Sequence, residues 1–128
     1  SPANLKFFFK TLVLIEEPEL NLHPALQSKL ADFFLDVHQR FSVDFLIETH
    51  SEYILRRSQV IVAINEFEIA PNENPFCVHY FPKDIQQMPY KLEYQEDGSF
   101  SRNFGDGFFD EASSSTLELL KLKRQKKA

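Results

Sequence analysis

Two acidic residues follow directly on a short apolar run near the start of the chain. Leu12 to Ile15 form the run, and Glu16 and Glu17 come immediately after it. An unbroken apolar run is typical of a strand covered on both faces in a parallel sheet, and ligands bind beyond the carboxyl ends of such strands. Because neighbouring side chains point to opposite faces of a strand, the two carboxylates can take different tasks. Phosphoryl transfer is a chemistry that needs little more than a positioned metal ion, a base and positive charge.

A histidine follows the next apolar run of the chain. Val43 to Ile47 form that run, and Glu48 comes directly after it. Thr49 and Glu52 match a capping box, which predicts Thr49 as the N-cap and His50 as the first residue of a helix. The N-terminus of a helix favours an anion, and an imidazole N–H there can donate to a phosphate. We expect His50 to lie at the same edge of the sheet as the acidic pair.

Strands and helices are expected to alternate through residues 11–65. Large apolar residues recur at helical spacing from Pro24 to Arg40: Leu26, Leu30, Phe33, Phe34 and Val37. Pro24 suits the first position of this helix, and His23 is interpreted as a capping or packing residue at its entrance. A second helix is expected to reach about Ile64. The pattern predicts an α/β fold in which the strands at 11–15 and 43–47 are parallel neighbours.

The rest of the chain predicts a hairpin region and a final helix. Phe76 to Phe81 is a third strand candidate, and Tyr90 to Phe100 alternate about a turn at Glu96-Asp97-Gly98. The Phe-rich stretch at residues 104–111 is interpreted as a structural turn or a partner contact. Ser113 to Ser115 precede the final amphipathic helix, which is expected over Leu117 to Leu122. We expect one domain over residues 1–128, with parts at 11–65, 76–112 and 113–128.

Composition excludes several classes of site. Cys77 is the single cysteine, which excludes an internal disulfide and a cysteine-based zinc cage. The three glycines open no phosphate-binding loop and no dinucleotide fingerprint. The longest apolar run, Val60 to Ile64, is far shorter than the roughly 20 residues that span a bilayer. No secretory leader opens the chain, and we expect a soluble, cytoplasmic protein with no membrane partner.

Charge is distributed unevenly along the chain. Residues 1–120 hold all 19 acidic residues and nine of the 14 basic ones, a net charge of −10. An acidic body repels phosphate backbones, which disfavours nucleic-acid binding by this part of the chain. The remaining basic residues form a tail: Lys121, Lys123, Arg124, Lys126 and Lys127. We interpret the tail as the solubilising end of a helix, with DNA contact as the alternative.

The stretch from Leu12 to Pro24 resembles a known family. Leu12-Val13-Leu14-Ile15-Glu16-Glu17 resembles the Walker B element of P-loop ATPases. ABC-type ATPases of the SMC and OLD groups have a stretch similar to its continuation, Pro18-Glu19-Leu20-Asn21-Leu22-His23-Pro24. Their switch, or H-loop, is similar to a second stretch, Phe45-Leu46-Ile47-Glu48-Thr49-His50-Ser51. The resemblance covers residues 11–58 and extends more loosely to 103–111. One departure is Glu16, where most of these ATPases carry Asp.

The resemblance implies roles for five residues. Glu16 would hold Mg²⁺ through water, and Glu17 would orient and deprotonate the attacking water. His50 would sense the γ-phosphate of ATP. Asn21 and Leu22 occupy the D-loop, which in ABC-type dimers communicates between the two nucleotide sites.

Two motifs of the family are missing from the sequence. It holds neither a Walker A loop nor a Leu-Ser-Gly-Gly-type signature, and both precede the Walker B strand in the family. We therefore expect the C-terminal portion of a longer ATPase: a partial P-loop NTPase layer of parallel strands with flanking helices, then a β-hairpin region and a C-terminal helix. Its partners would be the missing N-terminal half and a second head in a homodimer, in DNA-related work or phage defence. The alternative is a non-enzymatic module that docks proteins through Phe76 to Phe109.

The Walker A strand of the family's sheet, a central strand, is missing as well. It would lie between the strand at 43–47 and the strand near 76–82. An unpaired strand edge is costly to bury and prone to pair with extended segments. We expect strand 76–82 to pair directly with strand 43–47, or the Phe7-Phe8-Phe9 stretch of this chain or of a neighbouring copy to insert there.

The isolated chain is predicted to bind no ATP tightly and to hydrolyse none. The resemblance implies Mg²⁺ and ATP as cofactors of the longer protein, whose phosphate contacts come mainly from the Walker A backbone and lysine. Titration calorimetry of the chain with Mg-ATP is expected to show no micromolar binding. A clear isotherm would contradict the prediction.

Overall fold

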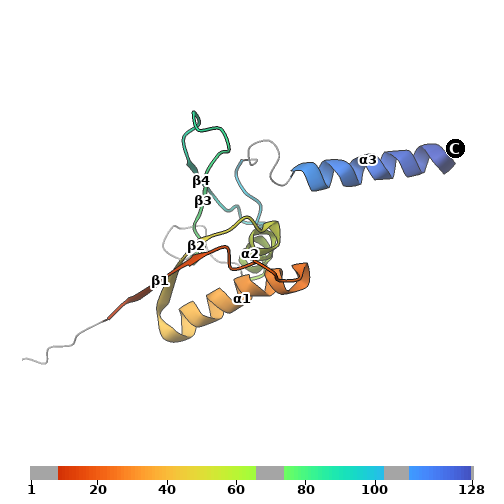
Figure 1. Ribbon diagram of the computed structural model, residues 1–128. Helices are drawn as coiled ribbons and strands as arrows, with labels where there is room; N and C mark the ends of the chain where they lie inside the picture. The colour runs from red at the N-terminus through yellow and green to blue at the C-terminus, as the bar shows by residue number, and fades with distance from the viewer. Residues whose placement is uncertain (1–8, 66–73, 103–109, 128) are drawn as a thin grey trace, which may run out of the picture.

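The computed structural model describes residues 9–65, 74–102 and 110–127. An α/β layer comes first, and a small antiparallel sheet and a long helix follow it (Figure 1). The elements in chain order are β1 (Thr11–Glu16), α1 (Pro24–Phe41), β2 (Val43–Glu48), α2 (Glu52–Asn65), β3 (Val78–Tyr80), β4 (Tyr90–Leu92) and α3 (Asp110–Lys127). The predicted alternation of strands and helices over residues 11–65 is confirmed.

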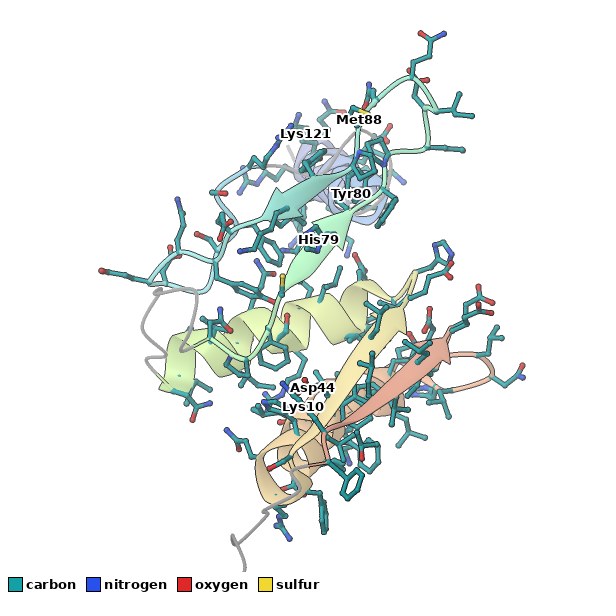
Figure 2. The ribbon with its side chains drawn as sticks, turned by 90° about the vertical axis from the view of Figure 1, so that its left-hand side faces the viewer. Lys10, Asp44, His79, Tyr80, Met88 and Lys121 are labelled. Carbon is teal, nitrogen blue, oxygen red and sulfur yellow. The ribbon has the colours of Figure 1, made fainter. Side chains whose placement is uncertain are left out.

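β1 and β2 form a two-stranded parallel sheet. Their register is unbroken along six residue pairs and ends with Glu16 opposite Glu48. Where the strands begin, Lys10 Nζ lies 2.7 Å from Asp44 Oδ2 (Figure 2). The predicted parallel pairing is therefore confirmed.

α1 covers one face of this sheet. α1 contacts both β2 and α2, and the ring centres of Phe34 and Phe45 lie 5.0 Å apart. Because side chains alternate along a strand, Leu12, Leu14 and Leu46 lie on the opposite face, where they are 60%, 69% and 65% exposed. The expectation that these strands are covered on both faces is wrong for the part of the chain that the structure describes, because none of its elements lies over the leucines.

The buried core joins α1 to α2. Ala31, Ile54 and Ile61 form its centre. Partly buried apolar side chains pack around them: Leu30, Leu35 and Phe76. Between the same two helices, Arg57 donates two hydrogen bonds of 2.8 Å to the carboxylate of Asp32, and they hold the pKa of Asp32 below its usual value.

α1 begins as predicted and ends one residue beyond the expected bound. Pro24 is its first residue, and His23 is the N-cap, whose Nδ1 accepts a hydrogen bond of 3.3 Å from the backbone N–H of Ala25. The interpretation of His23 as a capping residue is confirmed. After the helix, Ser42 adopts a left-handed conformation with a φ of 54°, and its N–H donates to the carbonyl oxygen of His38 at 3.0 Å.

β3 and β4 form an antiparallel sheet of their own, with Val78 opposite Leu92. Beyond β4, Tyr94 pairs with Phe100 across a turn in which Gly98 has a φ of 81°. The predicted hairpin about this turn is confirmed. The expectation that the third strand pairs with β2 is wrong, because β3 pairs with β4 instead; a nearby partner costs less loop-closure entropy than a distant one.

The second expected occupant of the β2 edge was the stretch from Phe7 to Phe9. Phe7 and Phe8 lie outside the described residues, and Phe9 is 92% exposed. Among residues 9–65, 74–102 and 110–127, no further strand pairs with β2.

The chain beyond β4 packs on α2. Tyr94 is buried, and its hydroxyl forms a hydrogen bond of 2.8 Å with Ser58 Oγ on α2. Burial disfavours the charged phenolate and raises the pKa of Tyr94 to about 12. The small sheet is thereby attached to the α/β layer through α2.

α3 contacts none of the other described helices and strands and extends away from them (Figure 1). It begins at Asp110, so Asp110 and Glu111, which were expected in a loop, are helical. The expectation that Ser113 to Ser115 precede the helix is wrong as well, because these serines lie within α3. Residues 103–109, the rest of the Phe-rich stretch, lie outside the described residues. In the described parts of the chain no helix combines the length and the apolar character needed to cross a membrane.

We predict that Gly98→Ala destabilises the fold by about 2 kcal/mol. A Cβ atom at Gly98 would clash with the carbonyl oxygen of Gln59 on α2, and the left-handed φ adds backbone strain. Urea denaturation of the purified variant measures the loss. Ser101→Ala, an exposed change in the same hairpin, is the control, and an equal effect of the two substitutions would contradict the prediction.

Candidate functional site

The carboxyl ends of β1 and β2 form an acidic edge. Glu16 and Glu48 are paired there, and the backbone N–H of Glu17 donates to the carbonyl oxygen of Glu48 at 2.8 Å. This bond extends the pairing of the two strands by one residue, so Glu17 is held at the end of the sheet. The expected position of the acidic pair at the sheet edge is confirmed.

Glu17 has a strained backbone. Its φ is 45°, a left-handed conformation that residues other than glycine rarely adopt. The chain turns immediately after it, where the N–H of Leu20 donates to the carbonyl oxygen of Glu17 at 3.1 Å and the N–H of Leu22 donates to that of Glu19 at 3.0 Å. Strain of this kind clusters at functional sites, where the surrounding structure over-determines it.

His50 lies between two carboxylates. Its Nε2 is 3.9 Å from Glu17 Oε1 and 3.9 Å from Glu48 Oε1. All three side chains are exposed to solvent, so an incoming ligand has access to them. The structure thus brings together Glu17 and His50, which are far apart in the sequence, as expected from the parallel pairing of their strands.

The predicted capping box at the start of α2 is wrong. α2 begins at Glu52, and the N-cap contact comes from Ser51, whose Oγ accepts a hydrogen bond of 3.4 Å from the N–H of Ile54. Thr49 Oγ1 instead accepts from the N–H of Ser51 at 3.0 Å. His50 therefore precedes the helix rather than opening it. Thr and Ser are both good caps, and the sequence does not distinguish between them.

Asn21 and Leu22, to which the resemblance gives the role of a D-loop, lie in the turn between β1 and α1. Asn21 has a φ of 64°, which asparagine tolerates better than most residues. The carbonyl oxygen of Leu22 accepts a hydrogen bond of 3.0 Å from Gln27 Nε2. Glu19, in the same turn, is bonded to His50: its Oε1 accepts a hydrogen bond of 2.8 Å from the backbone N–H of His50.

Sequence reasoning missed four residues of this site. Glu19 and Glu48 lie close to His50. Gln27 is bonded to Ser51, the residue that follows His50. For Glu48 a signal was present, because it ends its strand as Glu16 ends the first one. The hydrogen bond between Gln27 Oε1 and Ser51 Oγ, 2.6 Å long, spans 24 positions and has no local sequence signal.

The acidic edge has the chemistry of a Mg²⁺ site in which substrate phosphates supply some of the ligands. Among the described residues, no group of three or more His, Cys, Asp or Glu side chains is arranged to hold a metal ion. Mg²⁺ in phosphoryl-transfer sites is held by one or two carboxylates, by waters and by substrate phosphates. The exposed carboxylate of Glu16 therefore fits Mg²⁺ bound together with a nucleotide, and Glu16 is the residue to which the resemblance gives that role.

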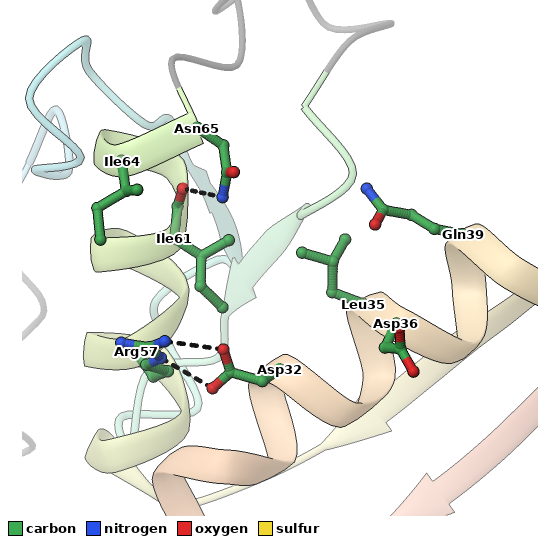
Figure 3. A pocket seen from close by; sticks show the side chains of 8 residues that line it. All are labelled: Asp32, Leu35, Asp36, Gln39, Arg57, Ile61, Ile64 and Asn65. Carbon is green, nitrogen blue, oxygen red and sulfur yellow. Dashed lines mark hydrogen bonds and ion pairs between the residues drawn. The ribbon is translucent and has the colours of Figure 1, made fainter.

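A groove between α1 and α2 is distinct from this edge (Figure 3). Its volume is about 340 Å³, and the Asp32–Arg57 ion pair lies along it. Gln39 and Asn65, from the last turns of the two helices, line its far part. The candidate site residues precede the first turns of the same helices, so the groove takes no part in the site.

Comparison with known protein families finds a match in the first half of the chain. Residues 6–55 match the family described as AAA ATPase domain. The match supports an AAA-type ATPase family. It includes β1, α1, β2 and the start of α2, with all the residues of the acidic edge. No curated protein and no solved structure matches the chain.

Ser51→Ala is predicted to destabilise the chain by about 1–2 kcal/mol. The substitution removes the cap of α2 and leaves the Gln27 side chain without its hydroxyl partner. Thr49→Val is the matched variant and is expected to cost less, because it removes a single hydrogen bond. Thermal and urea unfolding measure both, and a larger loss for Thr49→Val would place the cap at Thr49.

Proposed function

We propose that residues 11–65 are the Walker B to H-loop part of an ABC-type ATPase head of the SMC/OLD-like group. The observation that carries the proposal is the position of His50, 3.9 Å from Glu17 at the carboxyl end of two parallel strands. A hydrolytic ATPase site needs a base near the attacking water and a hydrogen-bond donor near the γ-phosphate, and a carboxylate and an imidazole side by side supply both.

The five site residues take separate tasks in this proposal. Glu16 holds Mg²⁺, which neutralises charge on the phosphates when it is bound. Glu17 orients the attacking water and accepts its proton. His50 donates an imidazole N–H to the γ-phosphate. Asn21 and Leu22 form the D-loop, in a turn that begins at the strained backbone of Glu17 and ends at α1.

The phosphate-binding loop of this ATPase must come from a segment outside the described residues. The exposed leucine face of the sheet, Leu12, Leu14 and Leu46, supports this view, because apolar surfaces of this kind mark interaction sites. The outer edge of β2 supports it as well, since no described strand pairs there. We propose an N-terminal half that carries Walker A as the partner at this surface and a homodimer of complete heads as the working form.

The task coupled to hydrolysis is proposed from the resemblance alone. ATPases of the SMC and OLD groups imply DNA-related work or defence against phage. If DNA is the target, the basic end of α3 is the part of the chain with suitable charge, because Lys121 to Lys127 hold five basic residues.

A second candidate function is a non-enzymatic interaction module. Phe81, Ile85 and Met88 support it, because they are 72%, 97% and 81% exposed on the connection between β3 and β4. Met88 lies at the far end of that small sheet, away from α2 (Figure 2). Exposed apolar side chains on a protruding connection suit a protein partner. The ATPase proposal is favoured because the AAA ATPase match lies on the acidic edge and not on this connection.

In the longer ATPase that contains this chain, Glu17→Gln is predicted to lower turnover by about 10²–10⁴-fold. The amide keeps the shape of the side chain but cannot accept the proton of the attacking water. Nucleotide binding is expected to stay close to that of the unmodified protein. Steady-state hydrolysis and nucleotide titration measure the two effects separately.

Glu96→Gln is the control, because Glu96 is an exposed glutamate of the hairpin turn, outside the acidic edge. It is expected to leave turnover unchanged. If Glu17→Gln retained most of the activity, Glu17 would not be the base.

A further inference from the structure

We propose that Glu19 is a positioning residue for His50. The inference rests on the proposed ATPase function and adds to it a residue that touches neither nucleotide nor metal. The glutamate belongs to the turn after β1, and the histidine belongs to the segment after β2, so their contact joins the two loops of the acidic edge.

The contact is a short hydrogen bond to an ionised acceptor. Glu19 Oε1 accepts from the backbone N–H of His50, with 2.8 Å between the nitrogen and the oxygen. Hydrogen bonds with a charged partner are shorter and about twice as strong as neutral ones. The bond acts on the backbone of His50 itself, so it fixes the position of the backbone from which the imidazole side chain extends.

A second bridge joins the same two loops. Gln27 on α1 donates from Nε2 to the carbonyl oxygen of Leu22 at 3.0 Å and accepts at Oε1 from the hydroxyl of Ser51 at 2.6 Å. Ser51 is buried, with 4% of its surface exposed. The residue next to His50 is therefore attached to the end of the turn in which Glu19 lies.

The remaining oxygen of Glu19 argues against a purely stabilising role. Glu19 Oε2 is inaccessible to solvent and has no hydrogen-bond partner among the described residues. A buried acceptor without a partner reduces stability. A side chain selected for stability alone would avoid this cost, whereas a side chain that must hold His50 in place retains it.

The consequence is that the D-loop and His50 move together. A displacement of the turn that contains Asn21 and Leu22 pulls on His50 through Glu19 and on Ser51 through Gln27. The imidazole then leaves its place between Glu17 and Glu48. Contacts that a neighbouring head makes with this turn would thereby control the phosphate sensor.

The first test measures the contact in the chain itself by NMR spectroscopy of the backbone amides. Glu19→Ala is expected to remove the downfield shift that the carboxylate gives the His50 amide proton. Glu19→Gln is expected to retain part of it, because Oε1 still accepts. Glu96→Gln is the control and is expected to leave the His50 signal unchanged. If Glu19→Ala does not fold, Glu19→Asp takes its place, because it withdraws the carboxylate by one methylene.

An unchanged His50 amide signal in Glu19→Ala, or in Glu19→Asp where that variant replaces it, overturns the inference. This outcome does not depend on any ATPase activity, so it is distinct from a failure of the proposed function.

The second test measures turnover in the longer ATPase that contains the chain. Glu19→Ala is expected to lower kcat by about 10²-fold, since small displacements of a catalytic group cost this much. The KM for ATP is expected to stay within about twofold, because Glu19 touches no nucleotide, and Glu19→Gln should recover most of the rate. An unchanged kcat in Glu19→Ala overturns the positioning role. Absence of hydrolysis by the unmodified protein overturns the proposed function and the role in turnover, while the amide spectra alone decide the contact.

Discussion

The parallel pairing of β1 with β2 is the constraint on which the rest of the structure depends. Its register places Glu16 opposite Glu48, and the bond from the N–H of Glu17 to Glu48 continues it past the end of β1. An offset of one residue would turn every side chain of one strand to the other face. The same set of backbone hydrogen bonds therefore determines both the apolar face packed against α1 and the acidic edge at the strand ends.

Local patterns in the sequence predict most of the α/β layer. Apolar runs before acidic residues identify β1 and β2, and Pro24 with its preceding histidine marks the start of α1. The start of α2 was misjudged because Thr49 and Ser51 are both suitable caps. Ser51 is the cap in the structure, and its hydroxyl is also held by Gln27 on α1. No local sequence pattern predicts a contact with a different helix.

The candidate site was predictable to the same extent. The meeting of Glu17 and His50 follows from strand direction alone, whereas the parts played by Glu19 and Gln27 depend on how the turn after β1 folds. The partner of β3 was misjudged for another reason. The resemblance led us to expect pairing with β2, but β3 pairs with β4, which is closer to it in the chain. The resemblance refers to a complete domain with a central strand between β2 and β3. Strand pairing in this chain depends on the strands that it contains.

The uncovered sheet has a practical consequence for handling the protein. Leu12, Leu14 and Leu46 lie beside the outer edges of β1 and β2, with which no further strand of residues 9–65, 74–102 and 110–127 pairs. Such an edge is a template on which further copies can stack, in the manner of cross-β assembly. Association of this kind grows with protein concentration, and a covering partner or a charged residue in place of Leu14 would oppose it.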